Sequence, residues 1–229
     1  VHEVAGWAVI HGGRQRTRTV AWLEVRNADL GEDVDPVALA HRRLQERGLG
    51  EAVGLLTSRR IDRFHEAAVA HDGLHARSLA TVGLSNALRV GDPPGPLRIG
   101  IAPGAPGYGT INVLVAVSAR LSEAAAWEAM SIATEARTAA VMAAGFPSRR
   151  TGAVATGTGT DCIVLAWPAG HGENEGKSGG DVDVDGGAHA VAFAGKHTPL
   201  GHAIGESVFE AVRAGVAAWL DEYQLGGTR

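Results

Sequence analysis

Cysteine is almost absent from this chain of 229 residues, which contains Cys162 alone. A single thiol excludes an intrachain disulfide and any metal site made of several cysteines. Long apolar runs are missing too: none approaches the roughly 18 residues of a membrane-spanning helix, so we expect no membrane partner. The formal net charge of −4 lacks the basic excess of a general nucleic-acid binder. Glu3 stands where a signal peptide carries basic residues, and we expect a cytoplasmic protein.

Lysine is scarce as well, with two among 21 basic residues, whereas glycine occurs 32 times. Ten histidines raise the question of a metal site. His71 and His75 flank an Asp-Gly turn, but no third ligand is indicated, so we expect no metal and no cofactor. The acidic stretch 181–186 resembles the start of a calcium loop, yet Ala192 occupies the position of the bidentate glutamate. We therefore interpret this stretch as a solvated hairpin tip.

Short apolar, β-branched segments bounded by turn residues predict strands. Val4–Ile10 and Thr19–Val25 predict one hairpin across Gly12-Gly13. A second hairpin is centred on Asp72-Gly73, the strongest two-residue turn signal in the chain, with arms Ala67–His71 and Ala76–Leu84. Further strands are expected at Val53–Thr57, Ile111–Ser118, Gly152–Thr156, Cys162–Trp167 and Ala188–Ala194.

Three helices are expected from capping residues and apolar spacing. They begin after Asp35, after Ser122 and at Pro199, and they end near Gly48, Gly145 and Tyr223. Glycine-rich loops are expected at Gly91–Gly109 and His171–Gly187. These elements predict an α+β fold, with a mixed, hairpin-rich sheet or sheets layered against about three main helices. No linker divides the chain, so we expect one domain over residues 1–229; neither the sheet order nor the oligomeric state follows from the sequence.

The strongest chemical signal is Ala155–Asp161, in which threonine alternates with glycine. Alternate side chains of an extended chain share a face, so Thr156, Thr158 and Thr160 would form one row. Hydroxyls beside exposed glycine N–H groups suit a polar ligand or a tetrahedral oxyanion. A strand edge without chemistry has the same pattern. The segment is not a dinucleotide fingerprint, because Cys162 replaces the third glycine.

Other polar residues are weaker candidates. Ser85 and Asn86 follow one predicted strand, and Thr110 and Asn112 begin another, where such side chains either bind an oxyanion or cap turns. Lys196, between a strand and the last helix, has the position of a base or a cation, or of an ordinary surface lysine.

Two further features favour structural interpretations. Glu128, Ser131, Glu135 and Thr138 share a stripe of the second helix, which is typical of a solvated face. Cys162 opens an apolar run, and we interpret it as a buried hydrophobe and not as a nucleophile.

An ordered set of segments resembles the adenosylcobinamide amidohydrolase family. The segments are LLTSRRI at 55–61, TVGLSNALRVGDP at 81–93, GTINVLV at 109–115, SEAAAWEAMSIATEARTAAV at 122–141, ATGTGTDCIVLA at 155–166 and FAGKHTPLGHAIG at 193–205. The resemblance implies hydrolysis of the amide between the aminopropanol arm and the corrin ring of adenosylcobinamide. The implied products are adenosylcobyric acid and 1-aminopropan-2-ol, and some members are expected to cleave adenosyl-pseudocobalamin as well. An adenosylated corrinoid would then be the partner, as substrate and not as cofactor.

Amide hydrolysis requires a nucleophile or activated water, oxyanion stabilisation and a proton for the leaving amine. On the resembling motifs, Thr158 or Thr160 would attack or position water, and Lys196, Glu135 or Asp161 would move protons. The N–H groups of Gly157 and Gly159, with Asn86 or Asn112, would hold the oxyanion. The residues expected to bind substrate are Ser85, Asn86, Thr110, Asn112, Thr156, Gly157, Gly159 and His197.

Two alternatives remain open on the sequence. One is a corrinoid-binding module without turnover. The other is an amide hydrolase of different substrate that uses a threonine nucleophile, or a self-processing threonine enzyme that uses Thr110 or Thr160 after internal cleavage. The acidic stretch His171–Gly187 looks longer than the corresponding connection of the family, which predicts a disordered loop or a flap over a large corrinoid.

Overall fold

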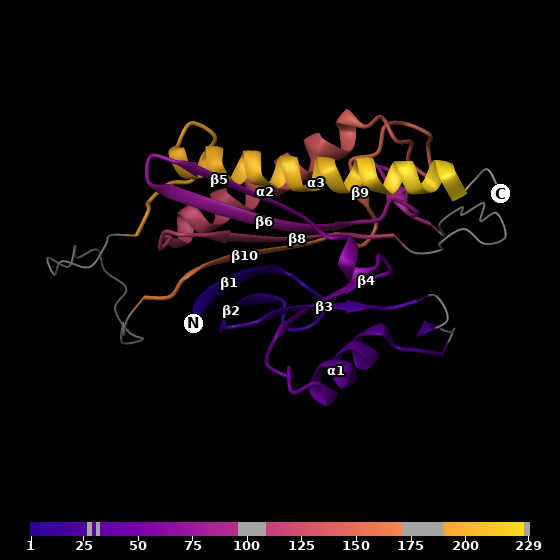
Figure 1. Cartoon of the computed structure of the whole chain (residues 1–229), viewed down its shortest axis with the longest axis horizontal. Coiled ribbons are helices and arrows are strands. Elements are labelled where there is room, and N and C mark those ends of the chain that lie inside the picture. The colour runs from indigo at the N-terminus through magenta and orange to yellow at the C-terminus, as the bar shows by residue number, and fades with distance from the viewer. Residues whose placement is uncertain (27–28, 31–32, 96–108, 171–189, 227–229) are drawn as a thin grey trace, which may run out of the picture.

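Six strands form the central sheet of the protein (Figure 1). The computed structural model describes residues 1–26, 29–30, 33–95, 109–170 and 190–226. From edge to edge the order is β2 (Gly13–Thr17), β1 (His2–Trp7), β10 (Cys162–Pro168), β8 (Ile111–Val117), β6 (Leu74–Val82) and β5 (His65–His71). β10 and β8 run parallel, and the other neighbouring pairs are antiparallel. With the helices described below, this mixed sheet confirms the predicted α+β class.

The hairpin between β5 and β6 confirms the Asp-Gly prediction. Asp72 and Gly73 have positive φ angles of 47° and 76°. Two consecutive positive φ values fit a tight hairpin turn whose twist matches that of the strands, and asparagine, aspartate and glycine tolerate them best. Asp72-Gly73 thereby sets the register in which His71 faces Leu74.

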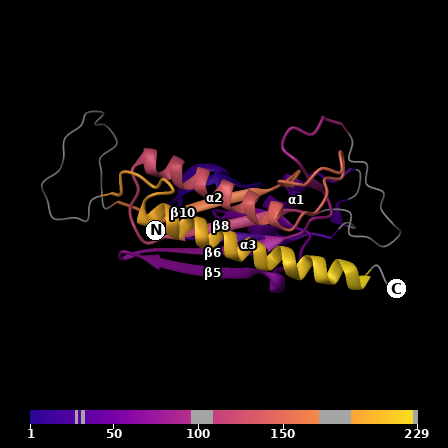
Figure 2. The same ribbon diagram turned by 90° about the horizontal axis from the view of Figure 1, so that it is seen from above.

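Two long helices, α2 (Glu123–Ala143) and α3 (Pro199–Gly226), cover one face of the sheet (Figure 2). The Ser122 hydroxyl caps α2 by accepting a hydrogen bond from Ala125 N at 3.1 Å, as predicted. The side chains of Ile204 and Val208 on α3 are fully buried in the main core. A Cβ on Gly215 would lie 2.6 Å from Val82 Cγ2, so the absence of a side chain lets α3 approach β6 closely.

A smaller layer covers the opposite face of the sheet. It consists of the parallel pair β3 (Val20–Glu24) and β4 (Val53–Thr57), with α1 (Pro36–Glu46) and a 3-10 turn at Ile61–Arg63. The side chains of Val53 and Leu55 pack against those of Val4, Cys162 and Val164. The sheet is therefore buried on both faces near β10.

The first predicted hairpin is wrong in its second arm. β1 pairs with Gly13–Thr17, and the apolar segment 19–25 instead supplies β3 of the smaller layer. The second arm was missed because β2 reads Gly-Arg-Gln-Arg-Thr, without the β-branched pattern of a buried strand. Charged side chains are usual on such an edge strand, where they discourage pairing with another chain.

Two other predicted strands are also wrong. In Gly152–Thr156 only Val154 makes a bridge, to Pro147, and the chain pairs one step later, where β9 (Gly157–Thr158) meets β7 (Ala87–Leu88). In the described part of 188–194, Val191 makes a single bridge to Leu121. Gly152–Thr156 comes after the turn that ends α2, and the described residues 190–194 precede α3. Short apolar runs do not distinguish a strand from a packed loop.

The predicted loop Gly91–Gly109 is free of helix and strand at residues 91–95 and 109, and residues 96–108 lie outside the described residues. The acidic stretch 171–187 also lies outside them. Among the residues that are described, no helix has the length and apolar character to cross a membrane.

Candidate active site

The Gly/Thr segment lies where β8 and β10 begin, beside the short β7–β9 ribbon. It joins β9 to β10 through a turn at Gly159 and Thr160. The segment is thus not the continuous strand that would align three threonines in one row. The turn instead gathers the polar groups of Thr158, Thr160 and Asp161 around the first residues of β8.

Asp161 is the centre of this cluster, and its side chain is 7% exposed. Its carboxylate accepts hydrogen bonds from Thr158 Oγ1 at 2.5 Å, from Thr158 N at 3.0 Å and from Ile111 N at 3.1 Å. It also forms an ion pair with the Arg137 guanidinium. Burial raises the pKa of Asp161, while Arg137 and the Thr158 donors oppose that rise. Because every partner donates, this hydrogen-bond pattern is that of a carboxylate.

Sequence reasoning missed Arg137, which occupies the core-facing stripe of α2. The signal was present: Ala126, Met130, Ala133, Arg137 and Ala140 follow one another at alternating spacings of four and three. An arginine on an otherwise apolar stripe needs a buried acceptor, because an unpaired charge is very costly away from water. Arg137 finds the Asp161 carboxylate, and it also donates to Thr156 O at 3.2 Å.

Gly157 makes room for this ion pair. A Cβ at Gly157 would overlap both the Arg137 guanidinium and the Asp161 carboxylate. The glycine expected to offer its N–H to an oxyanion therefore has a clear second role, which is to let two charged side chains pack over its backbone.

Replacing Gly157 with alanine is expected to destabilise the fold, because the new methyl group would force the Arg137–Asp161 pair apart. We expect a loss of about 1–3 kcal/mol in the free energy of unfolding, the usual cost of overfilling a packed site, measured by urea denaturation. Gly50→Ala is the matched control, since a Cβ there meets only Gln45 Cγ at 3.5 Å. Equal stability of the two variants would show that the ion pair shifts freely.

A second hydrogen-bonded group surrounds Thr160. Its hydroxyl lies 3.5 Å from Asn86 Nδ2 and 3.4 Å from Gly109 O, and its carbonyl accepts a hydrogen bond from Thr110 Oγ1 at 2.7 Å. Asn86 is 2% exposed, and its Oδ1 has no hydrogen-bond partner among the described residues. Thr160 itself is exposed. The cluster thus presents a hydroxyl to solvent above a buried amide.

Close backbone packing holds this end of the sheet together. A Cβ on Gly109 would lie 2.5 Å from Ser85 N, so the chain before β8 passes directly against the chain after β6. Ser85 is buried there. The Thr156 hydroxyl accepts a hydrogen bond from Val90 N at 2.8 Å and so attaches the segment after β7 to the Gly/Thr segment.

Four sequence-predicted residues lie elsewhere or have other partners. Lys196 pairs with Glu135, and both side chains are more than half exposed. This pair lines a hollow between α2 and α3, and His197 lies exposed beside Lys196. Asn112 is fully buried on the face of β8 toward β4, where its Nδ2 donates to Leu56 O at 2.7 Å. The contacts of these residues do not join them to Thr158 or Asp161.

Cys162 is buried, as predicted. Burial and the neighbouring Asp161 raise the pKa of its thiol from 9.0 to about 11. In the folded protein the thiol therefore keeps its proton at pH 8, and the reactive thiolate is correspondingly rare.

Native protein is expected to react with iodoacetamide at pH 8 roughly 100-fold more slowly than the same chain unfolded in urea, since a pKa rise of two units lowers the thiolate fraction by about that factor. Intact mass spectrometry over time measures both rates. Rapid labelling of the native protein would contradict the buried, protonated thiol.

Within the described part of the chain, no group of three or more histidine, cysteine, aspartate or glutamate side chains is arranged to hold a metal ion. The polar side-chain groups described above at the site are threonine hydroxyls, the Asp161 carboxylate, the Arg137 guanidinium and the Asn86 amide.

The fold and the site define an α+β protein in which a Thr–Asp–Arg cluster lies at one end of a mixed sheet. The chain belongs to the adenosylcobinamide amidohydrolase family, whose family model matches residues 1–224. This confirms the resemblance found in the sequence.

Two individual relatives carry the name of the same family. The adenosylcobinamide amidohydrolase of Methanosarcina mazei is 32% identical over 108 residues, which cover 47% of this chain and 46% of that protein. The one of Halobacterium salinarum is 32% identical over 136 residues, covering 59% and 47%. The matched part of the chain spans about half the length of these curated relatives.

Solved structures are more distant. The PH0078 protein of Pyrococcus horikoshii OT3 is 19% identical with a TM-score of 0.34, covering 67% of this chain and 39% of that one. A β-aminopeptidase of Burkholderia sp. is 20% identical with a TM-score of 0.36, covering 66% and 40%.

Proposed function

We propose that this protein hydrolyses the amide that joins the aminopropanol arm of adenosylcobinamide to the corrin ring, giving adenosylcobyric acid and 1-aminopropan-2-ol. Membership in the adenosylcobinamide amidohydrolase family supports the substrate and the reaction class. The observation that carries the proposal is the hydrogen bond from Thr158 Oγ1 to the buried Asp161 carboxylate. A hydroxyl bonded to a carboxylate in this way has a proton acceptor already in position.

In the proposed reaction, Thr158 Oγ1 attacks the amide carbonyl carbon while its proton passes to Asp161. The C–N bond then breaks, the amine leaves with the proton from Asp161, and the acyl group stays on Thr158 as an ester. Water attacks this ester and gives a proton to Asp161, which returns it to the departing Thr158 oxygen. The acid is released and the starting hydroxyl is restored.

Arg137 and burial have distinct roles in this scheme. Burial favours the protonated form of Asp161 and so makes its carboxylate a stronger base, while Arg137 keeps that carboxylate charged and oriented. The Asn86 amide and the N–H of exposed Gly159 are the donors that we assign to the developing oxyanion. Ser85, Thr110 and Thr156 hold the surrounding backbone in this proposal, and Lys196, Glu135 and His197 receive no role in the chemistry.

The test is to incubate purified, chelator-treated protein with adenosylcobinamide and to follow the corrinoid by mass spectrometry. We expect adenosylcobyric acid and free 1-aminopropan-2-ol to accumulate in equal amounts. In H₂¹⁸O the new carboxyl group should carry one labelled oxygen, because water cleaves the ester. Unchanged substrate that stays bound would overturn the proposal in favour of a binding module, and a chain shorter than the intact 23.6 kDa would point to self-processing.

A further inference from the structure

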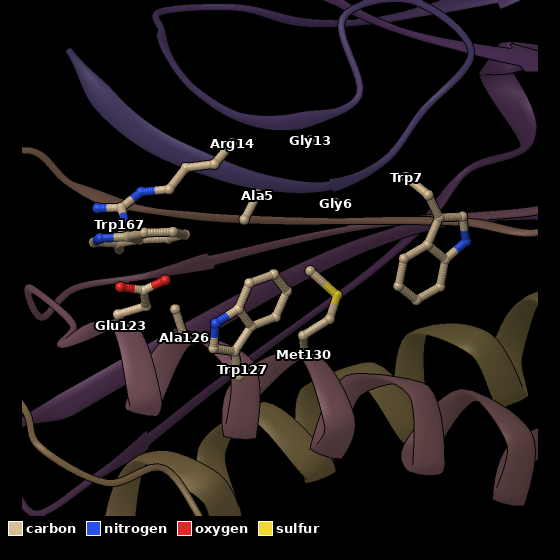
Figure 3. Close-up of a pocket in the computed structure, with 10 residues that line it drawn as sticks. All are labelled: Ala5, Gly6, Trp7, Gly13, Arg14, Glu123, Ala126, Trp127, Met130 and Trp167. Atoms are coloured by element: carbon tan, nitrogen blue, oxygen red, sulfur yellow. The ribbon is translucent and has the colours of Figure 1, made fainter.

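A pocket of about 190 Å³ opens between α2 and the β1–β2 edge of the sheet, and nothing in the proposed reaction uses it (Figure 3). We call it the tryptophan pocket. Its large side chains are those of Trp7, Trp127, Trp167, Met130, Arg14 and Glu123. The sheet side is formed by small residues, among them Gly6 and Gly13, and a Cβ on Gly13 would meet no atom within 4 Å.

The exposure of the indole rings is unusual. Trp127 is 63% exposed and Trp7 is 42% exposed, although tryptophan is on average a highly buried residue. Two large aromatic residues left open beside one hollow mark a binding site more often than a packing defect. Trp167 is different: it is buried, and Arg14 lies over its ring at 5.9 Å.

The tryptophan pocket adjoins the candidate active site. Trp7 Nε1 donates a hydrogen bond to the backbone carbonyl of Asp161 at 2.7 Å, so a side chain that lines the pocket contacts the central residue of the cluster. On α2, Met130 and Arg137 are seven residues apart on the same face, which is about 10 Å along a helix. A ligand held in the pocket would therefore reach Thr158 and Asp161 with another part of itself.

The size and chemistry of the pocket restrict which ligand group it can bind. Its volume is below the roughly 300–1,000 Å³ of sites that enclose a whole drug-sized ligand, so it holds one ring system of a larger molecule. Indole faces stack on planar rings of any base. Arg14, which also pairs with Glu3, and Glu123 are the charged side chains among the lining residues, and a purine's ring nitrogens and exocyclic amine can accept from the one and donate to the other.

We propose that the tryptophan pocket binds the adenine ring of the substrate's adenosyl group, with Trp127 as the principal stacking surface. This inference rests on the proposed function, because it names the part of the corrinoid substrate that the pocket recognises. The pocket thereby selects adenosylated corrinoids over corrinoids without the nucleoside, and it fixes the position of the amide relative to Thr158.

The experiment measures binding without turnover. Isothermal titration calorimetry with 5′-deoxyadenosine, which has no amide to cleave, reports the pocket alone. Titrations with adenosylcobinamide and dicyanocobinamide, which compare corrinoids with and without the nucleoside, are made in a Thr158→Ala background so that neither is hydrolysed. Trp127→Ala is the test variant, and because its side chain is mostly exposed the variant should fold. Trp22→Phe is the control, since Trp22 lies in β3 of the smaller layer.

We expect Trp127→Ala to weaken binding of 5′-deoxyadenosine and adenosylcobinamide by about 5- to 150-fold, the range of one base–aromatic stack, and to leave dicyanocobinamide unchanged. Trp22→Phe should change none of the three. Absence of 5′-deoxyadenosine binding, equal weakening of all three ligands, or a change of oligomeric state in Trp127→Ala would each overturn the inference. Binding that depends on Trp127 in a protein that does not hydrolyse the amide would sustain the pocket and reject the proposed reaction.

Discussion

Replacing Thr158 with alanine is expected to lower kcat for adenosylcobinamide hydrolysis by about 10³-fold or more, the scale on which loss of an attacking hydroxyl slows hydrolases. The side chain is partly exposed and gives one hydrogen bond to Asp161, so the fold should survive with a loss of about 1–2 kcal/mol. KM should change little, because Thr158 acts on the reacting carbonyl. Steady-state rates from product mass spectrometry, with urea unfolding alongside, measure both effects.

The conservative variant separates chemistry from packing. Thr158→Ser keeps the hydroxyl next to Asp161 and should retain activity to within about tenfold. Thr138→Ala, one residue beyond Arg137 on α2, removes another partly exposed threonine and should behave as the unaltered protein does. Full activity in Thr158→Ala would reject Thr158 as the nucleophile. Loss of activity in Thr160→Ala instead would move the assignment to that exposed hydroxyl.

Local signals predicted much of the fold. The helix bounds followed from the caps at Asp35 and Ser122, and both side chains accept the expected backbone hydrogen bonds. The Asp72-Gly73 turn followed from the tolerance of these residues for positive φ. Partner choice did not follow, because the apolar segment 19–25 is equally suited to a hairpin arm and to a strand of a second layer. The segment becomes β3 because it pairs with β4 and packs against α1, and these contacts are formed with residues later in the chain.

The sequence predicted which segment carries the candidate site, but it did not predict how the residues of that segment are arranged. Alternating threonines suggested a row of hydroxyls, but a turn at Gly159 brings Thr158 to Asp161 and leaves Thr160 with Asn86. Arg137 escaped notice because a helical arginine is ordinarily solvated, and only its position on the buried stripe distinguishes it. Asn112 was placed beside strand-end residues by sequence proximity, whereas the alternation of β8 directs it to the opposite layer.

The second large effect is expected at Arg137. Replacing it with methionine should lower the free energy of unfolding by about 3–5 kcal/mol, because the Asp161 carboxylate would remain buried without its cation. For a protein of this size that corresponds to a fall in Tm of about 6–20 °C, measurable by calorimetry. Activity should fall as well, since Asp161 would take up a proton and no longer accept one from Thr158.

A double-mutant cycle distinguishes the ion pair from two independent effects. Asp161→Asn alone leaves the guanidinium unpaired, whereas Arg137→Met combined with Asp161→Asn removes both charges. The combined variant should be more stable than the sum of the single losses predicts by about 0.5–3 kcal/mol, the coupling usual for residues in contact. It should nevertheless remain inactive, because no carboxylate is left to accept the Thr158 proton. Additive losses would mean that the two charges do not depend on each other, and an active double variant would remove Asp161 from the reaction.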